Sequence, residues 1–181
     1  MARALGFCLF DTAIGACGIA WSADALAAVQ LPEATPQGTR ARLLRYTGEA
    51  GESAPPGFVQ AAIARIQRLL EGEADTLADL PLALEDVPEF HRRVYEVTRA
   101  IPPGEVLTYG EVARRVGEPG ASRAVGQALG RNPFAPVVPC HRVLAAGGKS
   151  GGFSAEGGAM TKLRMLEIEK ARLGGGPGLF A

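Results

Sequence analysis

Cysteine, histidine and tryptophan are scarce in this chain, with three, two and one among its 181 residues. Cys8, Cys17 and Cys140 cannot all pair with one another, so we expect reduced thiols and not a disulfide framework. Two of them are interpreted as core residues, which leaves one to explain. His91 and His141, without any Cys-x-x-Cys pair, do not predict a metal site, and no zinc is expected.

Long hydrophobic runs are missing as well. The opening segment MARALGFCLFDTAIGACGIAWS contains a basic residue and many apolar ones, but Asp11 interrupts it too early for a signal peptide or a membrane helix. We therefore expect a cytoplasmic protein without a membrane partner, associated with the nucleoid if its source is bacterial. At 47% hydrophobic residues, the chain can bury one good core, or a medium domain with a smaller partner.

Net charge is also absent, but the two signs are divided along the chain. Residues 1–87 hold 6 basic and 11 acidic residues, a net charge of −5, whereas residues 88–181 hold 13 and 8, a net charge of +5. A basic half is what a partner of a polyanion such as DNA would carry. An ordinary solvated surface can carry a similar excess, so charge alone does not decide.

The N-terminal half predicts a small β-rich domain. FCLF and ACGIAW flank the turn-prone DTAIG, which is the pattern of a β-hairpin. After the proline- and glycine-rich GESAPPG, apolar residues recur at helical spacing over residues 58–70 and predict an amphipathic helix. The acidic segment GEADTLADLPLALEDVP is interpreted as a linker. Asp86 and Glu89 then resemble a helix-start pair for a helix that PPG ends.

Two further helices are predicted around a glycine-rich turn. Thr108 and Glu111 fit a capping box, in which a hydroxyl and a carboxylate satisfy free backbone donors at a helix start. Gly117, Pro119 and Gly120 end this helix, and ASRAVGQALG opens the next one. The arrangement is a helix-turn-helix. The small residues of its second helix indicate either tight packing against the core or a surface that a partner approaches closely.

The segment VVPCHRVL brings a thiol, an imidazole and a guanidinium together in Cys140, His141 and Arg142. A thiolate is the nucleophilic form of cysteine, and a nearby base or positive charge controls how easily it forms. The alternative is a buried structural cysteine beside two surface residues, because neighbours on an extended segment point to opposite faces. A Cys-His pair on its own favours that alternative, so the rest of the chain must decide.

Taken in order, YGEVARRVG, SRAVGQALGRNP, VVPCHRV, GGFS and KLRMLEIE resemble the O6-alkylguanine-DNA alkyltransferases, also called methylated-DNA–protein-cysteine methyltransferases. The resemblance implies a mixed α/β (α+β) fold. Residues 1–87 would form a small β-sheet domain of ribonuclease H-like topology with its linker. Residues 88–173 would form a helical DNA-binding and alkyl-acceptor domain with the helix-turn-helix, followed by a flexible tail over residues 174–181.

The same resemblance implies the catalytic roles. Cys140 corresponds to the nucleophile that accepts the alkyl group, and His141 to the base that takes its proton through water. Glu169 corresponds to the carboxylate that orients His141; Glu167 competes for this role, but the spacing within KLRMLEIE favours Glu169. Asn132 would brace the turn before the active-site segment.

Tyr109 corresponds to the proton donor for the departing guanine, which would otherwise leave as an anion. Val143 and Ser154 would line the substrate pocket, although FSAEGGAMTK is two residues longer than in many family members. Arg123 corresponds to the arginine that fills the base stack when the target nucleotide is flipped out, a step that a thiol reacting with a base in duplex DNA requires. In this family the helix that follows enters the minor groove, where bulky side chains would not fit, which gives a purpose to its small residues. The other predicted DNA-binding residues are Ala124, Gly126, Gln127, Gly130 and Arg131.

The resemblance therefore implies a single-turnover DNA repair protein, a monomer whose partner is double-stranded DNA carrying O6-alkylguanine, with O4-alkylthymine as a second candidate lesion. It needs no cofactor, because the DNA carries the electrophile. One alternative is an alkyltransferase-like protein that binds damage without repairing it, but such proteins lack the acceptor cysteine. A second is a cysteine hydrolase, which would need an oxyanion hole for which the sequence has no separate motif.

Overall fold

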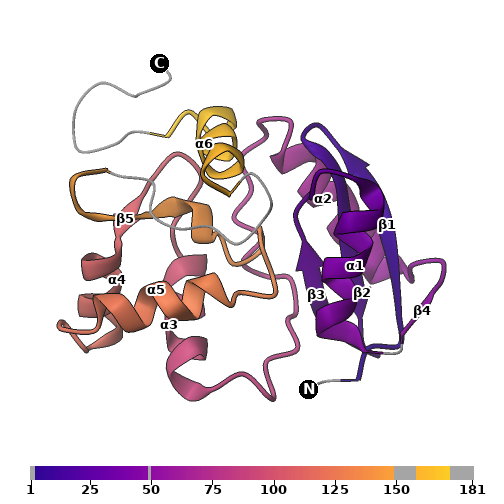
Figure 1. The fold of residues 1–181 in the computed structure, drawn as a ribbon, viewed down its shortest axis with the longest axis horizontal. Coiled ribbons are helices and arrows are strands. Elements are labelled where there is room, and N and C mark those ends of the chain that lie inside the picture. The colour runs from indigo at the N-terminus through magenta and orange to yellow at the C-terminus, as the bar shows by residue number, and fades with distance from the viewer. Residues whose placement is uncertain (1–2, 49, 149–157, 172–181) are drawn as a thin grey trace.

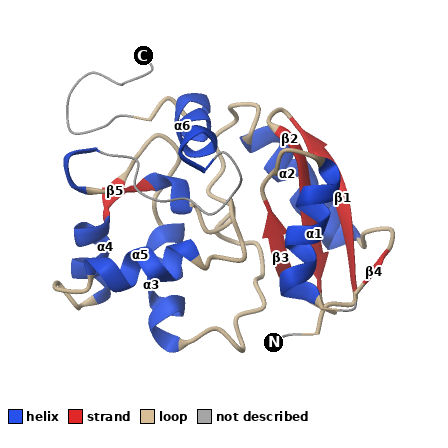
Figure 2. Cartoon of the chain, in the orientation of Figure 1, coloured by secondary structure: helices blue, strands red, loops and turns tan. Residues whose placement is uncertain are grey.

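A strand-rich part and a helical part lie side by side in the computed structural model, which describes residues 3–48, 50–148 and 158–171 (Figure 1). Nearly all of the strand residues belong to the first part (Figure 2). Its elements are β1 (Gly6–Thr12), β2 (Gly15–Trp21), β3 (Leu26–Gln30), α1 (Pro36–Thr47), β4 (Gly51–Glu52) and α2 (Gly57–Leu69). Those of the second part are α3 (Glu89–Arg99), β5 (Leu107–Thr108), α4 (Tyr109–Val116), α5 (Ser122–Gly130), η1 (Cys140–Arg142), β6 (Val143–Leu144), η2 (Ala146–Gly148) and α6 (Gly158–Ile168).

The N-terminal sheet has the strand order β3-β2-β1-β4. β1 and β2 pair antiparallel from Gly6 opposite Trp21 to Thr12 opposite Gly15, which confirms the predicted β-hairpin. Gly15 has a φ of 125°, a backbone conformation that residues with a Cβ rarely adopt, so glycine suits this turn. β3 continues the antiparallel pairing, and β4 runs parallel to β1. The ribonuclease H-like topology stays a prediction.

Helices cover both faces of this sheet, so alternate residues along its strands are buried on opposite sides (Figure 1). On one face, residues such as Ile19 and Trp21 pack against α2, which occupies residues 57–69 where the sequence predicted 58–70. On the other face, Phe7 and Ala20 pack against Leu43 of α1. The sequence reasoning missed α1, because PQGTRARLLRYT is mostly polar and buries only Thr39, Leu43 and Thr47.

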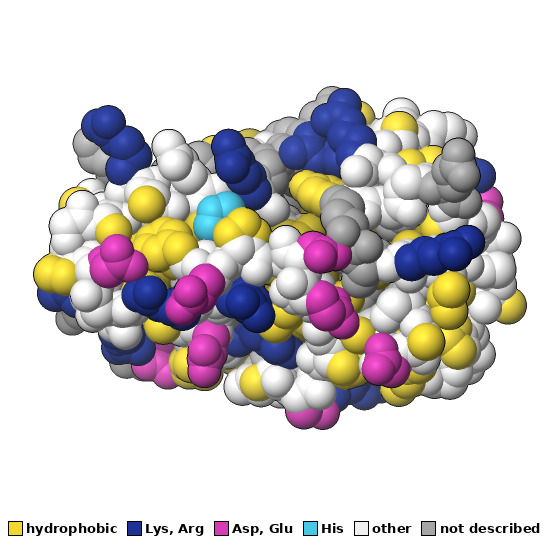
Figure 3. Space-filling view, turned by 90° about the horizontal axis from the view of Figure 1, so that it is seen from below, with side chains coloured by type: hydrophobic (Ala, Val, Ile, Leu, Met, Phe, Trp, Pro, Cys, Tyr) yellow, Lys and Arg dark blue, Asp and Glu magenta, His cyan; other side chains and the backbone are white. Residues whose placement is uncertain are grey.

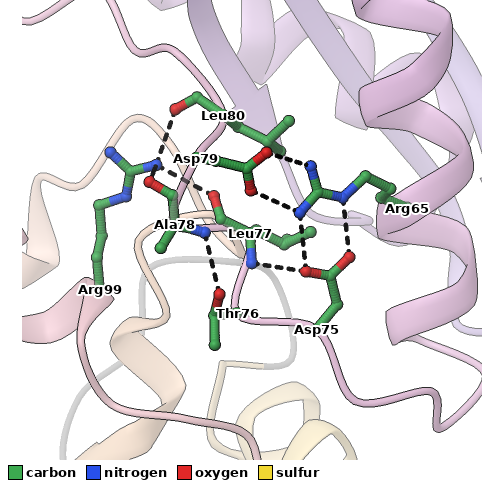
Figure 4. A network of polar contacts seen from close by, with 8 residues as sticks. All are labelled: Arg65, Asp75, Thr76, Leu77, Ala78, Asp79, Leu80 and Arg99. Atoms are coloured by element: carbon green, nitrogen blue, oxygen red, sulfur yellow. Dashed lines mark hydrogen bonds and ion pairs between the residues drawn. The ribbon is translucent and has the colours of Figure 1, made fainter.

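The segment between α2 and α3 is held from both parts of the molecule (Figure 4). Arg65 of α2 donates hydrogen bonds to both carboxylate oxygens of Asp75, at 2.9 Å each, and also binds Asp79. From α3, Arg99 Nη2 donates to three backbone carbonyl oxygens of the same segment, those of Leu77, Ala78 and Leu80. The acidic segment is thus fixed by arginines on either side, and its role as a linker between two domains stays a prediction.

Three helices form the centre of the C-terminal part. α3, α4 and α5 pack on one another through buried apolar residues: Val94, Tyr95, Val112, Ala113, Val125, Ala128 and Leu129. Thr108 caps α4 by accepting a hydrogen bond from the backbone N–H of Glu111 at 3.1 Å, as predicted. The predicted start of α3 is wrong: its N-cap is Pro88, without a side-chain cap, and not Asp86.

The turn between α4 and α5 begins at Gly117, whose φ of 92° ends α4 in the left-handed conformation. Parallel pairing of β5 with β6 then brings Thr108 beside Leu144. The start of α4 therefore lies next to the segment that follows Cys140. No helix within the described part of the chain is long and apolar enough to cross a membrane.

Candidate active site and DNA-binding face

Cys140, His141 and Arg142 form a single 3-10 turn, and all three side chains are buried. The exposed fractions are 7% for Cys140, 0% for His141 and 1% for Arg142. The interpretation as a buried cysteine beside two surface residues is therefore wrong. It assumed an extended segment, whereas the chain turns after Pro139 and packs against α6, which surrounds the imidazole and the guanidinium with protein.

Glu169, just after α6, holds both of these buried side chains. Its Oε1 lies 2.8 Å from Nε2 of His141. Arg142 binds the same carboxylate with two donors, Nε to Oε2 at 3.0 Å and Nη2 to Oε1 at 2.7 Å. Glu167, the competitor in the sequence, is exposed to solvent. The geometry thus brings Glu169, and not Glu167, to the histidine.

These contacts set the charges of the group. Burial opposes ionisation of Glu169, but His141 and Arg142 outweigh it and lower the pKa of the carboxyl group to about 2. Burial lowers the pKa of His141 below its usual value, although Glu169 pulls in the other direction. A neutral imidazole that donates Nε2–H to the carboxylate leaves Nδ1 as an acceptor. Among the described residues, this buried Nδ1 has no protein partner, so it is free to take a proton.

The Cys140 thiol needs such a base. Burial raises the pKa of Cys140, and the nearby Asn132 side chain and the Lys162 charge only partly offset this effect. The resting group is therefore a thiol at neutral pH, which becomes a nucleophile when its proton is removed.

Asn132 fixes the turn that leads to Cys140. Its Oδ1 accepts the backbone N–H of Phe134 at 2.9 Å, and its Nδ2 donates to the carbonyl oxygen of Val138 at 2.8 Å. The Cys140 N–H donates to the same Val138 carbonyl, also at 2.8 Å. The Asn132 amide therefore connects the two ends of the turn, Phe134 and Val138, and Val138 in turn binds the backbone of Cys140.

Tyr109, the first residue of α4, stands half-buried near the thiol. Burial raises the pKa of its hydroxyl, and Cys140 adds to the effect. The Lys162 ammonium lies 5.8 Å from the centre of the Tyr109 ring and donates to the carbonyl oxygen of Val143 at 2.7 Å. Val143 itself is fully buried, whereas Ser154 lies outside the described residues.

Arg142 and Lys162 are the two site residues to which the sequence reasoning gave no role. Both are fully buried charges, and burial lowers the pKa of Lys162 to about 8. Lysine and arginine are almost never fully buried unless they are paired. Their positions inside apolar motifs, VVPCHRV and KLRMLEIE, were the available signal.

The predicted DNA-binding residues share one face of α5 and its C-terminal end. Arg123, Gln127, Gly130 and Arg131 are exposed, and Ala124 and Gly126 are partly exposed. A Cβ added to Gly130 would meet no atom within 4 Å, and one added to Gly126 would only touch Tyr109 at 4.0 Å. Packing within the protein therefore does not require glycine at these positions, which favours the alternative of a closely approached surface.

Charges are mixed on the face of the molecule shown in Figure 3. Several basic side chains stand along the upper edge of that view, and acidic side chains lie below them. The basic excess of residues 88–181 is therefore not a single continuous patch on this face.

Comparisons with known proteins identify the family. A model of the 6-O-methylguanine DNA methyltransferase DNA-binding domain matches residues 89–171. The methylated-DNA–protein-cysteine methyltransferase of Mycobacterium tuberculosis is 41% identical over 137 residues, which cover 74% of this chain and 81% of that protein. The chain belongs to the O6-methylguanine DNA methyltransferase family.

Other members of this methyltransferase family agree over most of the chain. The protein of Methanothermobacter thermautotrophicus is 36% identical over 161 residues, covering 87% of this chain and 81% of that relative. The crystal structure of the Mycobacterium tuberculosis OGT in complex with DNA superposes with a TM-score of 0.73 at 34% identity, covering 91% of this chain and 92% of that one. The methyltransferase from Pyrococcus kodakaraensis gives a TM-score of 0.68 at 27% identity, covering 91% and 98%.

Proposed function

We propose that this methyltransferase repairs DNA by moving an alkyl group from O6 of guanine to Sγ of Cys140. Family membership and the names of the relatives establish the class of activity, a methylated-DNA–protein-cysteine methyltransferase acting in DNA repair. The observation that carries the residue assignment is the buried 2.8 Å contact between His141 and Glu169, made from the same 3-10 turn that holds Cys140. Burial, which raises the pKa of Cys140 and lowers that of His141, supports a thiol and a neutral imidazole at rest.

The reaction follows from the state of each residue. His141 Nδ1 takes the thiol proton of Cys140 through a water molecule, and the imidazolium is stabilised by Glu169. The Sγ lone pair then forms a bond to the alkyl carbon while the bond from that carbon to O6 breaks. The guanine takes a proton from the Tyr109 hydroxyl, which regains one from His141 through solvent. Overall, one proton moves from the thiol to guanine and the alkyl group moves to sulfur.

The DNA is held, in this proposal, by α5 in the minor groove of the duplex, with one protein monomer at each lesion. Arg123 is exposed near the start of the helix, where it can occupy the space left by the flipped nucleotide. The small residues Ala124, Gly126 and Gly130 allow the helix backbone to approach the groove. Contacts of this kind depend on the DNA backbone and its deformability more than on base sequence.

Intact mass spectrometry after incubation with duplex DNA that contains O6-methylguanine tests the transfer. We expect a permanent gain of one methyl group per chain with excess lesion, since a thioether is a poor leaving group and the site holds no second thiol. Cys140→Ala should bind the lesion without any gain in mass. Binding by the parent protein without transfer would favour an alkyltransferase-like protein, and removal of more than one methyl group per chain would favour a hydrolase.

Arg123→Ala tests the role of α5 separately. We expect it to slow repair of duplex DNA far more than reaction with the free alkylated base, because the arginine acts on base extrusion and not on bond formation. Gln127→Ala, on the same exposed face, is the matched control for a general loss of DNA contacts. Equal losses on the duplex and on the free base would contradict the assignment of Arg123.

A further inference from the structure

Within the described part of the chain, the polar contacts of Arg142 are made to buried groups of the protein. Two of its nitrogens bind the Glu169 carboxylate, and Nη1 donates to the carbonyl oxygen of Ile101, just after α3, at 2.8 Å. The side chain is 1% exposed, so none of these bonds is replaced by bulk water. Burying a guanidinium costs free energy unless its donors are paired. The burial of Arg142 therefore indicates a role other than that of a surface charge.

The important contact is the shared oxygen. Oε1 of Glu169 accepts from both His141 Nε2, at 2.8 Å, and Arg142 Nη2, at 2.7 Å. A carboxylate that faced the imidazole alone would stabilise its protonated form strongly. With the guanidinium on the same carboxylate, the negative charge is already balanced before His141 accepts any proton.

The other charged or titratable groups described around His141 do not balance the negative charge of Glu169. Cys140 lies beside it in the same turn and is neutral at rest. Lys162, from α6, is a second positive charge near the site, but its ammonium donates to the Val143 carbonyl and not to Glu169. Among the described residues, Arg142 is the one charged side chain that shares the Glu169 carboxylate with His141.

We propose that Arg142 is a positioning residue that keeps His141 neutral at rest by balancing the charge of Glu169, so that the imidazole can accept the Cys140 proton. This inference rests on the proposed function. A protonated His141 could not act as a base, and Cys140 would remain a thiol. Arg142 therefore acts together with the burial of His141 to lower the pH at which the methyltransferase still reacts, in addition to holding Glu169 in place.

The direction of the effect can be worked out from the charges. Loss of the guanidinium removes a positive charge that lowers the pKa of His141, so this pKa rises. Because a nearby like charge disfavours the protonated imidazole, we expect Arg142→Met to raise the pKa of His141. The acidic limb of the transfer rate against pH should move up equally, with about a tenfold slower reaction below the limb for each unit.

The experiment measures the pKa and the rate on the same variants. His141 is titrated by NMR in protein with isotope-labelled histidine, and His91→Gln assigns the signals because the chain has only two histidines. Single-turnover transfer from a duplex with O6-methylguanine is followed over the same pH range. Arg142→Lys, which keeps the positive charge but loses the two-pronged contact, is the matched control and should shift both curves less than Arg142→Met.

The outcomes separate the two proposals. Slower transfer by Arg142→Met at every pH, with the His141 pKa and the acidic limb unchanged, would leave Arg142 with a structural role and overturn the inference. If that variant does not fold, the titration of the parent protein decides: the inference requires a neutral His141 at pH 7, and a protonated one overturns it. A parent protein that transfers no methyl group overturns the proposed function instead, whatever the titration shows.

Discussion

Replacing Asn132 gives the most direct test of how the fold positions Cys140. In Asn132→Ala, the buried N–H of Phe134 loses its acceptor, whereas the Val138 carbonyl loses one donor but keeps the Cys140 N–H. An unsatisfied buried group costs about 1–3 kcal/mol and an ordinary hydrogen bond about 1 kcal/mol. We therefore expect the free energy of unfolding to fall by about 2–4 kcal/mol, with slower alkyl transfer because the turn before Cys140 is loosened.

Asn132→Asp separates the two bonds. Its carboxyl group keeps an acceptor for Phe134 but, when ionised, presents an oxygen to the Val138 carbonyl and a negative charge to Cys140. Burial, and the repulsion between the ionised carboxylate and the Val138 carbonyl oxygen, should raise the pKa of the new carboxyl group in the folded state above its pKa in the unfolded state. The stabilisation by its protonated form is then present at low pH and is lost as the pH rises through the folded pKa.

Urea unfolding of both variants and the parent at pH 5 and pH 8 measures these effects. The deficit of Asn132→Asp relative to the parent should be smaller at pH 5 than at pH 8, while that of Asn132→Ala should be the same at both. A cost below about 1 kcal/mol for Asn132→Ala would refute the bracing role, since a hydrogen bond of ordinary strength would then account for all of it.

Two further substitutions test neighbouring parts of the site. Glu169→Gln should slow alkyl transfer in single-turnover assays with little change in duplex affinity, because the carboxylate supports His141 from inside the protein; an equal loss from the exposed Glu167→Gln would contradict this assignment. Gly126→Ala should stabilise α5 by up to about 1 kcal/mol in thermal unfolding, because the added Cβ only touches Tyr109. The same variant should bind duplex DNA more weakly if α5 enters the groove, and unchanged affinity would place the DNA elsewhere.

Local patterns in the sequence predicted much of the fold. Two short apolar runs on either side of a turn-prone segment predicted the β1–β2 hairpin, helical spacing predicted α2, and the Thr108 cap marked the start of α4. α1 was missed because its burial is limited to a few positions on a polar helix, which periodicity does not reveal. The start of α3 was misplaced because its N-terminus has no side-chain cap to recognise.

The candidate site was harder to derive from local patterns, because its partners are far apart in the chain. His141 and Glu169 are separated by 28 residues, and Arg142 and the Ile101 carbonyl by 41. The resemblance to the family supplied the first pair, since Glu169 lies within a recognisable motif. The apolar residues around Arg142 were a signal of its burial, but they did not indicate which carboxylate it would bind, because this depends on the 3-10 turn that VVPCHRVL adopts in the fold.

The linker held by Arg65 and Arg99 has a consequence for how the molecule unfolds. Its residues Leu77 and Leu80 belong to the core under the N-terminal sheet, and Val137 from the C-terminal part is buried in that same core. Neither part can open fully without exposing apolar surface that the other one covers. We therefore expect one cooperative unfolding transition for the whole chain. A substitution that destabilises the strand-rich part would then also lower the fraction of molecules in which Cys140 is folded and able to react.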